Sequence, residues 1–122
     1  MTAPLREAVE AALDKKARGV TVLEMEEASS FTDHFLICSG ASSTQIQTIS
    51  DEIDRRLTLA GLHPLHVEGY NHGEWILMDY VHFVVHIFSE RARAFYDLER
   101  LWRTARRIPI EEQEQGKREQ EA

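Results

Sequence analysis

The run of residues 82–88 constrains the fold of this chain more than any other segment. Its centre, Phe-Val-Val-His-Ile-Phe, is rich in β-branched and aromatic residues, which favour a strand over a helix. A continuous apolar run of this length is typical of a strand buried within a sheet. Two shorter runs precede it, at residues 65–68 and 74–79, and together the three segments predict consecutive strands.

Helical patterns stand before, between and after the predicted strands. Apolar residues recur at helical spacing over residues 5–13, 46–57 and 95–102. The sequence Ser42-Ser43-Thr44-Gln45 matches a capping box, in which Ser42 accepts from the amide of Gln45 and the Gln45 side chain reaches back. Ser89 can cap the last helix, which we expect to end at Pro109.

Two further strands, at residues 20–25 and 34–39, complete the order α-β-β-α-β-β-β-α. We therefore predict an α/β fold with a single mixed sheet of about five strands flanked by helices. A polar loop is expected at residues 28–33, a hairpin loop at 69–73 and a tight turn at 80–81.

Length and charge limit the class of protein. The 122 residues suit one domain, which we assign to residues 1–108, followed by an acidic tail at 109–122 that we expect to be disordered. The net charge of -7 argues against a protein that covers nucleic acid by itself, because phosphates demand clustered Lys and Arg. An acidic domain is better suited to a basic protein partner.

No segment predicts export or membrane insertion. The start of the chain lacks the apolar core of a secretory signal, and no apolar run approaches the ~20 residues that a membrane span needs. The single cysteine, Cys38, lies in an apolar strand and is expected to be a core residue rather than a nucleophile. We expect a cytoplasmic protein.

The corner Ser39-Gly40-Ala41-Ser42 leaves a nucleotide-binding alternative open. A Gly-Ser corner between a strand and a helix can hold a triphosphate, but nucleotidyltransferases also need clustered carboxylates for magnesium. Glu74 and Asp79 are five positions apart, which on a strand means opposite faces and about 16 Å. They cannot share a metal ion, so helix capping is the simpler interpretation of the corner.

The histidines and arginines give weaker indications. His82 and His86 would be about 13 Å apart on a strand, too far for a shared zinc ion, so we predict no metal site. Six arginines between residues 91 and 107 could touch RNA phosphates, but Glu90, Asp97 and Glu99 interleave with them and pairing on a helix is commoner.

The aromatic and acidic residues around the third and fourth predicted strands are the best candidates for a binding surface. If Ile76 and Met78 face the helices, Trp75 and Asp79 lie on the other face of the sheet. Exposed aromatic residues beside carboxylates are typical of protein interfaces. Trp102 is instead expected in the core. No set of catalytic residues accompanies them, which favours a binding protein over an enzyme.

Several separated motifs resemble the ribosomal silencing factor family, also called the Iojap or RsfS family. The likeness covers about residues 5–106. At Val81-His82 the chain departs from the Gly-Asp turn that is common in the family, and at His34 from a frequent Tyr. The motifs are Asp14-Lys15-Lys16-Ala17, Thr32-Asp33-His34-Phe35, Ser39-Gly40-x-Ser42-x-x-Gln45, Glu68-Gly69 with Trp75 and Asp79, Val85-His86, and Arg93-x-Phe95-Tyr96-Asp97-Leu98-Glu99-x-Leu101-Trp102.

The resemblance implies a nucleotidyltransferase-like fold without the catalytic carboxylates, and no enzymatic activity, cofactor or small-molecule substrate. It also implies a translational repressor that docks on ribosomal protein L-fourteen of the large subunit, blocks joining of the small subunit under nutrient limitation, and forms a homodimer when free. Ribosomal RNA would be at most a minor contact. The surface residues that we predict to bind the ribosomal protein are Glu68, Tyr70, Trp75, Asp79, Tyr80, Tyr96 and Glu99.

Overall fold

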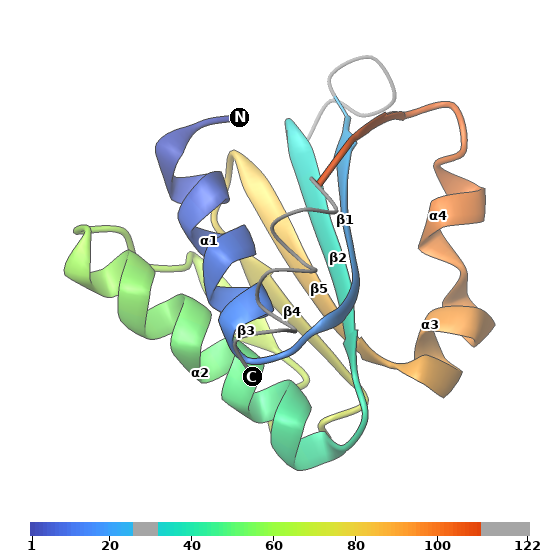
Figure 1. Ribbon diagram of the computed structural model, residues 1–122, viewed down its shortest axis with the longest axis horizontal. Helices are drawn as coiled ribbons and strands as arrows, with labels where there is room; N and C mark the ends of the chain where they lie inside the picture. Colours follow the sequence, from blue (N-terminus) through green and yellow to red (C-terminus); the bar gives the residue numbers. More distant parts are fainter. Residues whose placement is uncertain (26–31, 111–122) are drawn as a thin grey trace.

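A computed structural model describes residues 1–25 and 32–110 of the chain. One six-stranded mixed sheet forms the centre, with helices on both faces (Figure 1). The elements in chain order are α1 (Ala3–Asp14), β1 (Arg18–Glu24), β2 (His34–Gly40), α2 (Ser43–Leu59), β3 (His66–Glu68), β4 (Trp75–Asp79), β5 (Phe83–Ser89), α3 (Glu90–Tyr96), α4 (Leu98–Leu101) and β6 (Arg106–Ile108).

The apolar run of the sequence is a central strand of the sheet. The strand order is β3-β4-β5-β2-β1-β6, and β5 pairs with β2 in parallel while every other pair is antiparallel. All residues of β5 from Phe83 to Phe88 are buried. Because helices or side chains cover both faces at this position, the strand is apolar throughout rather than alternating.

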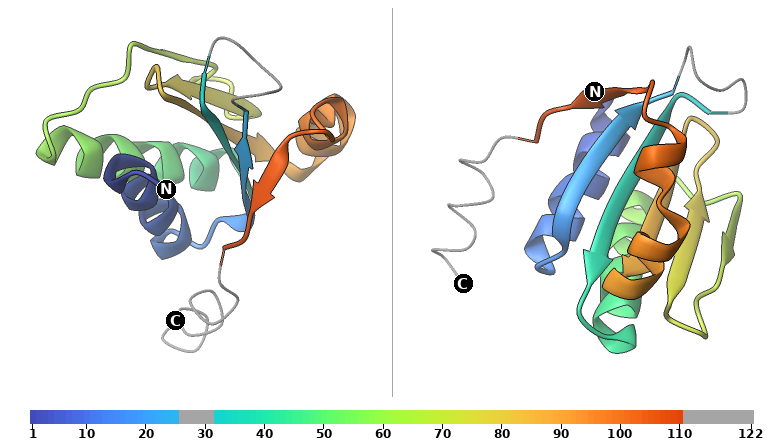
Figure 2. Two further views of the ribbon diagram at one scale, coloured as in Figure 1. Left: turned by 90° about the horizontal axis from the view of Figure 1, so that it is seen from above. Right: turned by 90° about the vertical axis from the view of Figure 1, so that its right-hand side faces the viewer.

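The two faces of the sheet are covered unequally (Figure 2). The long helices α1 and α2 lie side by side on one face and bury the larger core, which includes Ile76 and Met78 of β4. The short helices α3 and α4 lie on the other face, where a smaller core forms around Phe35 and Phe88. On this second face no described helix lies over β3 and β4.

The last predicted helix is wrong in its extent. It does not run to Pro109: α3 ends at Tyr96, Asp97 adopts a left-handed conformation (φ 49°, ψ 52°), and the four-residue α4 follows. Residues 106–108 then pair antiparallel with β1 as a sixth strand, where we expected about five. Ile110 packs against the larger core.

The remaining predictions for the elements agree with the structure where it describes them. The order of the first seven elements is confirmed, Cys38 is buried, and burial raises the pKa of its thiol to about 12. Most of the loop predicted at residues 28–33 lies outside the described residues. So does the tail from Glu111 onwards.

The turn between β4 and β5 holds a valine in an unfavourable conformation. Val81 has φ 74°, and the His82 amide donates to the carbonyl of Tyr80 at 2.9 Å, which makes a three-residue γ-turn. Hydrogen bonds fix this residue on both sides: its amide donates to Asp79 Oδ1 (2.8 Å), and its carbonyl accepts from Thr32 Oγ1 (3.0 Å). A β-branched side chain at positive φ is sterically strained.

Replacing this valine with glycine is expected to stabilise the protein. Val81→Gly removes the steric cost of the positive φ, and Val81 is half exposed, so little apolar burial is lost. After the entropy of glycine in the unfolded chain is subtracted, the free energy of unfolding should rise by about 0.5–1.5 kcal/mol. Urea unfolding followed by circular dichroism measures the change.

Val81→Ala is the matched control, because alanine keeps a Cβ atom at the same positive φ. Its gain should be less than half that of glycine. A Val81→Gly variant less stable than the wild type would show that the turn stores no strain.

Candidate protein-interaction surface

Aromatic and acidic side chains gather on the part of the sheet that no described helix covers. In the antiparallel β3–β4 ladder Glu68 lies opposite Leu77, so both side chains project from the face that also carries Trp75 and Asp79. The end of α3 adds Phe95 and Tyr96 beside Trp75. We call this set of residues, Glu68, Trp75, Leu77, Asp79, Phe95 and Tyr96, the β4 surface.

Trp75 is held in a fixed orientation at the centre of the β4 surface. Its ring lies 4.6 Å from that of Tyr96 and 5.0 Å from that of Phe88, measured between centroids. Its indole N–H donates to Nδ1 of His86 at 3.1 Å. His86 is buried, and this burial lowers its pKa to about 4, so the imidazole is neutral and its Nδ1 is free to accept. A half-buried tryptophan fixed in this way offers a rigid apolar contact.

A groove of about 510 Å³ runs beside Trp75. Its walls are Glu74, Trp75, Arg91, Ala92, Phe95 and Tyr96. Phe95 is 79% exposed, although the sequence places it in a run of apolar residues at helical spacing over residues 95–102. The break at Asp97 explains the difference, because it separates Phe95 from the residues of α4 that do pack on the sheet. The side chain that sequence reasoning missed is therefore the most exposed aromatic group of the surface.

Three predicted contact residues lie elsewhere. Tyr80 is buried in the larger core and stacks on Phe83 at 5.0 Å, so it offers no area to a partner and its assignment is corrected. Tyr70 turns toward α2, where its hydroxyl donates to Asp51 at 2.9 Å. Glu99 forms ion pairs with Arg93 and Arg107. Hydrogen bonding to Arg93 lowers the pKa of Glu99, which keeps its carboxylate charged within the molecule.

At the corner proposed for nucleotides, two backbone amides and the Gln45 side chain form hydrogen bonds within the protein. Ser42 Oγ accepts from the Gln45 amide at 3.1 Å, as the capping box predicts. The Gln45 side chain does not return to Ser42; its Oε1 accepts from the Ala41 amide at 2.6 Å, and its Nε2 donates to the carbonyls of Lys15 and Lys16. The backbone amides of Ala41 and Gln45 are therefore not available to a phosphate.

The loop between β3 and β4 also contacts the start of α2. At Gly73, which has φ 64°, an added Cβ would lie 2.5 Å from Cβ of Ser43. The side chain of Gln47 donates to the carbonyl of Tyr70 at 2.8 Å and holds the loop there. The loop therefore lies beside the helix N-terminus, where Ser42, Ser43 and Thr44 remain exposed.

The histidines and arginines were the other candidate groups. Within the described residues no three His, Cys, Asp or Glu side chains are placed to hold a metal ion. Arg93 and Arg107 pair with Glu99, whereas Arg91, Arg100 and Arg103 have no acidic partner among residues 1–25 and 32–110. A contact between these arginines and RNA stays a prediction. No described helix is long and apolar enough to cross a membrane.

Comparisons with known proteins agree on one family. A family model described as "Ribosomal silencing factor during starvation" matches residues 2–122. The chain is 40% identical over 107 residues to the ribosomal silencing factor RsfS of Halalkalibacterium halodurans, covering 88% of this chain and 92% of that protein. It is 39% identical over 98 residues to that of Bacillus subtilis, covering 80% and 83%. A crystal structure from Chromobacterium violaceum superimposes with a TM-score of 0.79 at 29% identity, covering 81% and 82%.

Nucleoside triphosphates are expected not to bind at the Ser39–Ser42 corner. Because the Ala41 and Gln45 amides are occupied and the described residues offer no cluster of three carboxylates for magnesium, the melting temperature should stay within about 0.5 °C when ATP or GTP is added with magnesium. A ligand at about 100 times its Kd would instead stabilise the fold by about 2.7 kcal/mol. Thermal-shift measurements distinguish the two, and a clear dose-dependent rise would restore the nucleotide interpretation.

Proposed function

We propose a specific role for this chain, which belongs to the ribosomal silencing factor family, a family of non-enzymatic ribosome-binding regulators. The chain docks on ribosomal protein L-fourteen of the large subunit and prevents the small subunit from joining. It acts when nutrients are limited. The mechanism is steric, since no bond is made or broken: a folded domain occupies a surface that the small subunit must contact.

The composition of the β4 surface is the observation that carries this proposal. It presents Trp75, Phe95 and Tyr96 around a groove, with Glu68 and Asp79 on the adjoining strands. Aromatic side chains supply rigid contact area that is desolvated on binding, and carboxylates select a partner that carries Lys or Arg. Ribosomal proteins that contact RNA are basic, so the surface has the chemistry that such a partner requires.

The charge of the chain supports docking on protein rather than on RNA. The net charge of -7 opposes indiscriminate adhesion to phosphates, while it speeds encounter with a basic protein. We propose that ribosomal RNA makes at most a minor contact, and that the free protein is a homodimer. Light scattering of the purified protein measures its mass in solution and tests the second point.

Removing the most exposed aromatic side chain is expected to weaken binding without changing the fold. Phe95→Ala should lower the affinity for isolated large subunits at least tenfold, about 1.4 kcal/mol, because the groove loses one wall. Trp75→Ala and Asp79→Lys should act in the same direction. Co-sedimentation at increasing protein concentration measures the affinity, and circular dichroism confirms that each variant is folded.

Leu59→Ala is the matched control for Phe95→Ala. Leu59 is 76% exposed, but it lies on α2 and does not line the groove. It should bind large subunits like the wild type. If folded Phe95→Ala, Trp75→Ala and Asp79→Lys all bind normally, the partner uses another surface.

A further inference from the structure

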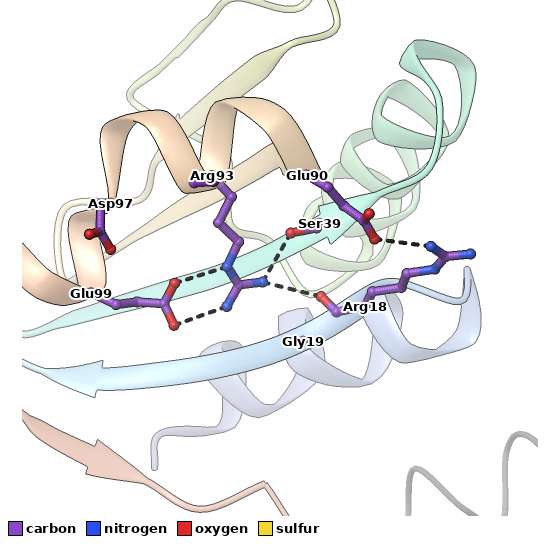
Figure 3. A pocket seen from close by; sticks show the side chains of 8 residues that line it. Arg18, Gly19, Ser39, Glu90, Arg93, Asp97 and Glu99 are labelled. Carbon is purple, nitrogen blue, oxygen red and sulfur yellow. Dashed lines mark hydrogen bonds and ion pairs between the residues drawn. The ribbon is translucent and has the colours of Figure 1, made fainter.

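Arg93 is the most extensively bonded side chain of the second face. It projects from α3 into a space between α4 and the strands β1 and β2 (Figure 3). Its Nε and Nη2 donate to the two carboxylate oxygens of Glu99 at 2.9 and 3.1 Å. Its Nη1 donates to Ser39 Oγ at 3.0 Å, and longer bonds of 3.4 Å reach the Arg18 carbonyl and Thr21 Oγ1. We call these five residues the Arg93 cluster.

All the hydrogen-bonding capacity of Arg93 is used inside the molecule. A guanidinium group has five N–H donors, and the cluster supplies an acceptor for each. The side chain is 17% exposed. Because the planar guanidinium fixes the direction of each hydrogen bond, Arg93 fixes the relative positions of the residues that it contacts.

The pair of Arg93 and Glu99 depends on the break between α3 and α4. The two residues are six positions apart, and in a continuous helix they would be separated by about 9 Å along the axis and would point in different directions. The left-handed conformation of Asp97 turns the chain so that Glu99 faces back toward Arg93. The ion pair therefore stabilises the turn at Asp97, and this turn brings Arg93 and Glu99 close enough to pair.

The strand side of the cluster is shaped to receive the guanidinium. Gly19 has φ 57°, and a Cβ atom added there would lie 2.7 Å from Nη1 of Arg93. Any larger residue at this position would push the side chain away from Ser39. The absence of a side chain at Gly19 thus leaves room for the guanidinium beside the β1 backbone.

The consequence of this fixed break is the position of the α3 end. Tyr96 immediately precedes Asp97, and its ring lies 4.6 Å from that of Trp75. Phe95 forms a wall of the neighbouring groove. Beyond the break, Trp102 meets Phe35 edge-on at 6.1 Å, which anchors the other arm of the turn. The positions of Phe95 and Tyr96 on the β4 surface thus depend on where Arg93 attaches α3 to the sheet.

We propose that Arg93 is a positioning residue for partner binding: tied to Glu99, Ser39 and β1, it sets the place of Phe95 and Tyr96 on the β4 surface. This inference rests on the proposed function, because it assigns Arg93 an effect on that same docking surface. Glu99, which the sequence assigned to the partner, acts here through Arg93. Neither side chain needs to touch the partner.

Arg93→Lys is the first variant to make, because lysine keeps the charge but cannot form the fork with Glu99 and reach Ser39 as well. We expect its affinity for large subunits to fall about fivefold, by loss of pre-organisation. Glu99→Gln should act in the same direction, and it keeps the test decisive if the lysine variant does not fold. Arg55→Lys is the matched control, since Arg55 forms a comparable fork with Glu52 on α2, away from the β4 surface.

A positioning role predicts that the effect of Arg93 disappears when the positioned groups are absent. In a Phe95→Ala, Tyr96→Ala background, Arg93→Lys should cause no further loss of affinity. A partner-independent readout is the fluorescence of Trp75 in Trp102→Phe protein, where it is the only tryptophan. Arg93→Lys should alter the Trp75 emission because Tyr96 moves, and Arg55→Lys should not.

The outcomes separate this inference from the proposed function. If Trp75→Ala and Phe95→Ala weaken binding but folded Arg93→Lys and Glu99→Gln do not, the surface is right and the role of Arg93 is overturned. An equal loss from Arg93→Lys with and without Phe95 and Tyr96 would also overturn it. If the wild type does not bind large subunits at all, the proposed function fails and this role fails with it.

Discussion

The parallel pairing of β2 with β5 is the constraint on which the rest of the molecule depends. Both strands lie in the middle of the sheet and are buried on both faces, so each face must carry a covering layer. A parallel pair also requires a long connection, and here α2 and the β3–β4 hairpin provide it. The same connection covers one face of the sheet with α2. It also extends the sheet beyond β5 with β4 and β3, which carry much of the candidate surface.

Because the two faces are covered unequally, part of one face stays accessible for binding. The two long helices bury one face, whereas the break at Asp97 confines α3 and α4 to part of the other. Trp75 therefore stays half exposed, supported by His86, Phe88 and Tyr96. At the Gly40 corner, Gln45 occupies the Ala41 amide and the loop at Gly73 lies against Ser43. The fold therefore presents a surface for binding a partner.

Local patterns in the sequence were sufficient to predict most of the elements, but not their long-range partners. The apolar run at residues 82–88, the capping of α2 and the outward face of Trp75 follow from periodicity and side-chain chemistry. The break at Asp97 does not, because it is stabilised by Arg93 contacts with strands more than fifty residues away. The burial of Tyr80 and the exposure of Phe95 were missed for the same reason: both depend on tertiary packing, which residue type does not reveal.

Subunit joining in a purified system tests the central claim most directly. Large and small ribosomal subunits are mixed at increasing concentrations of this protein, and the fraction of joined ribosomes is measured beside the fraction of large subunits occupied. Steric occlusion predicts that joined ribosomes decrease in proportion to occupied large subunits, with no protein on the small subunit. Large subunits that are saturated with the protein and still join normally would contradict the account.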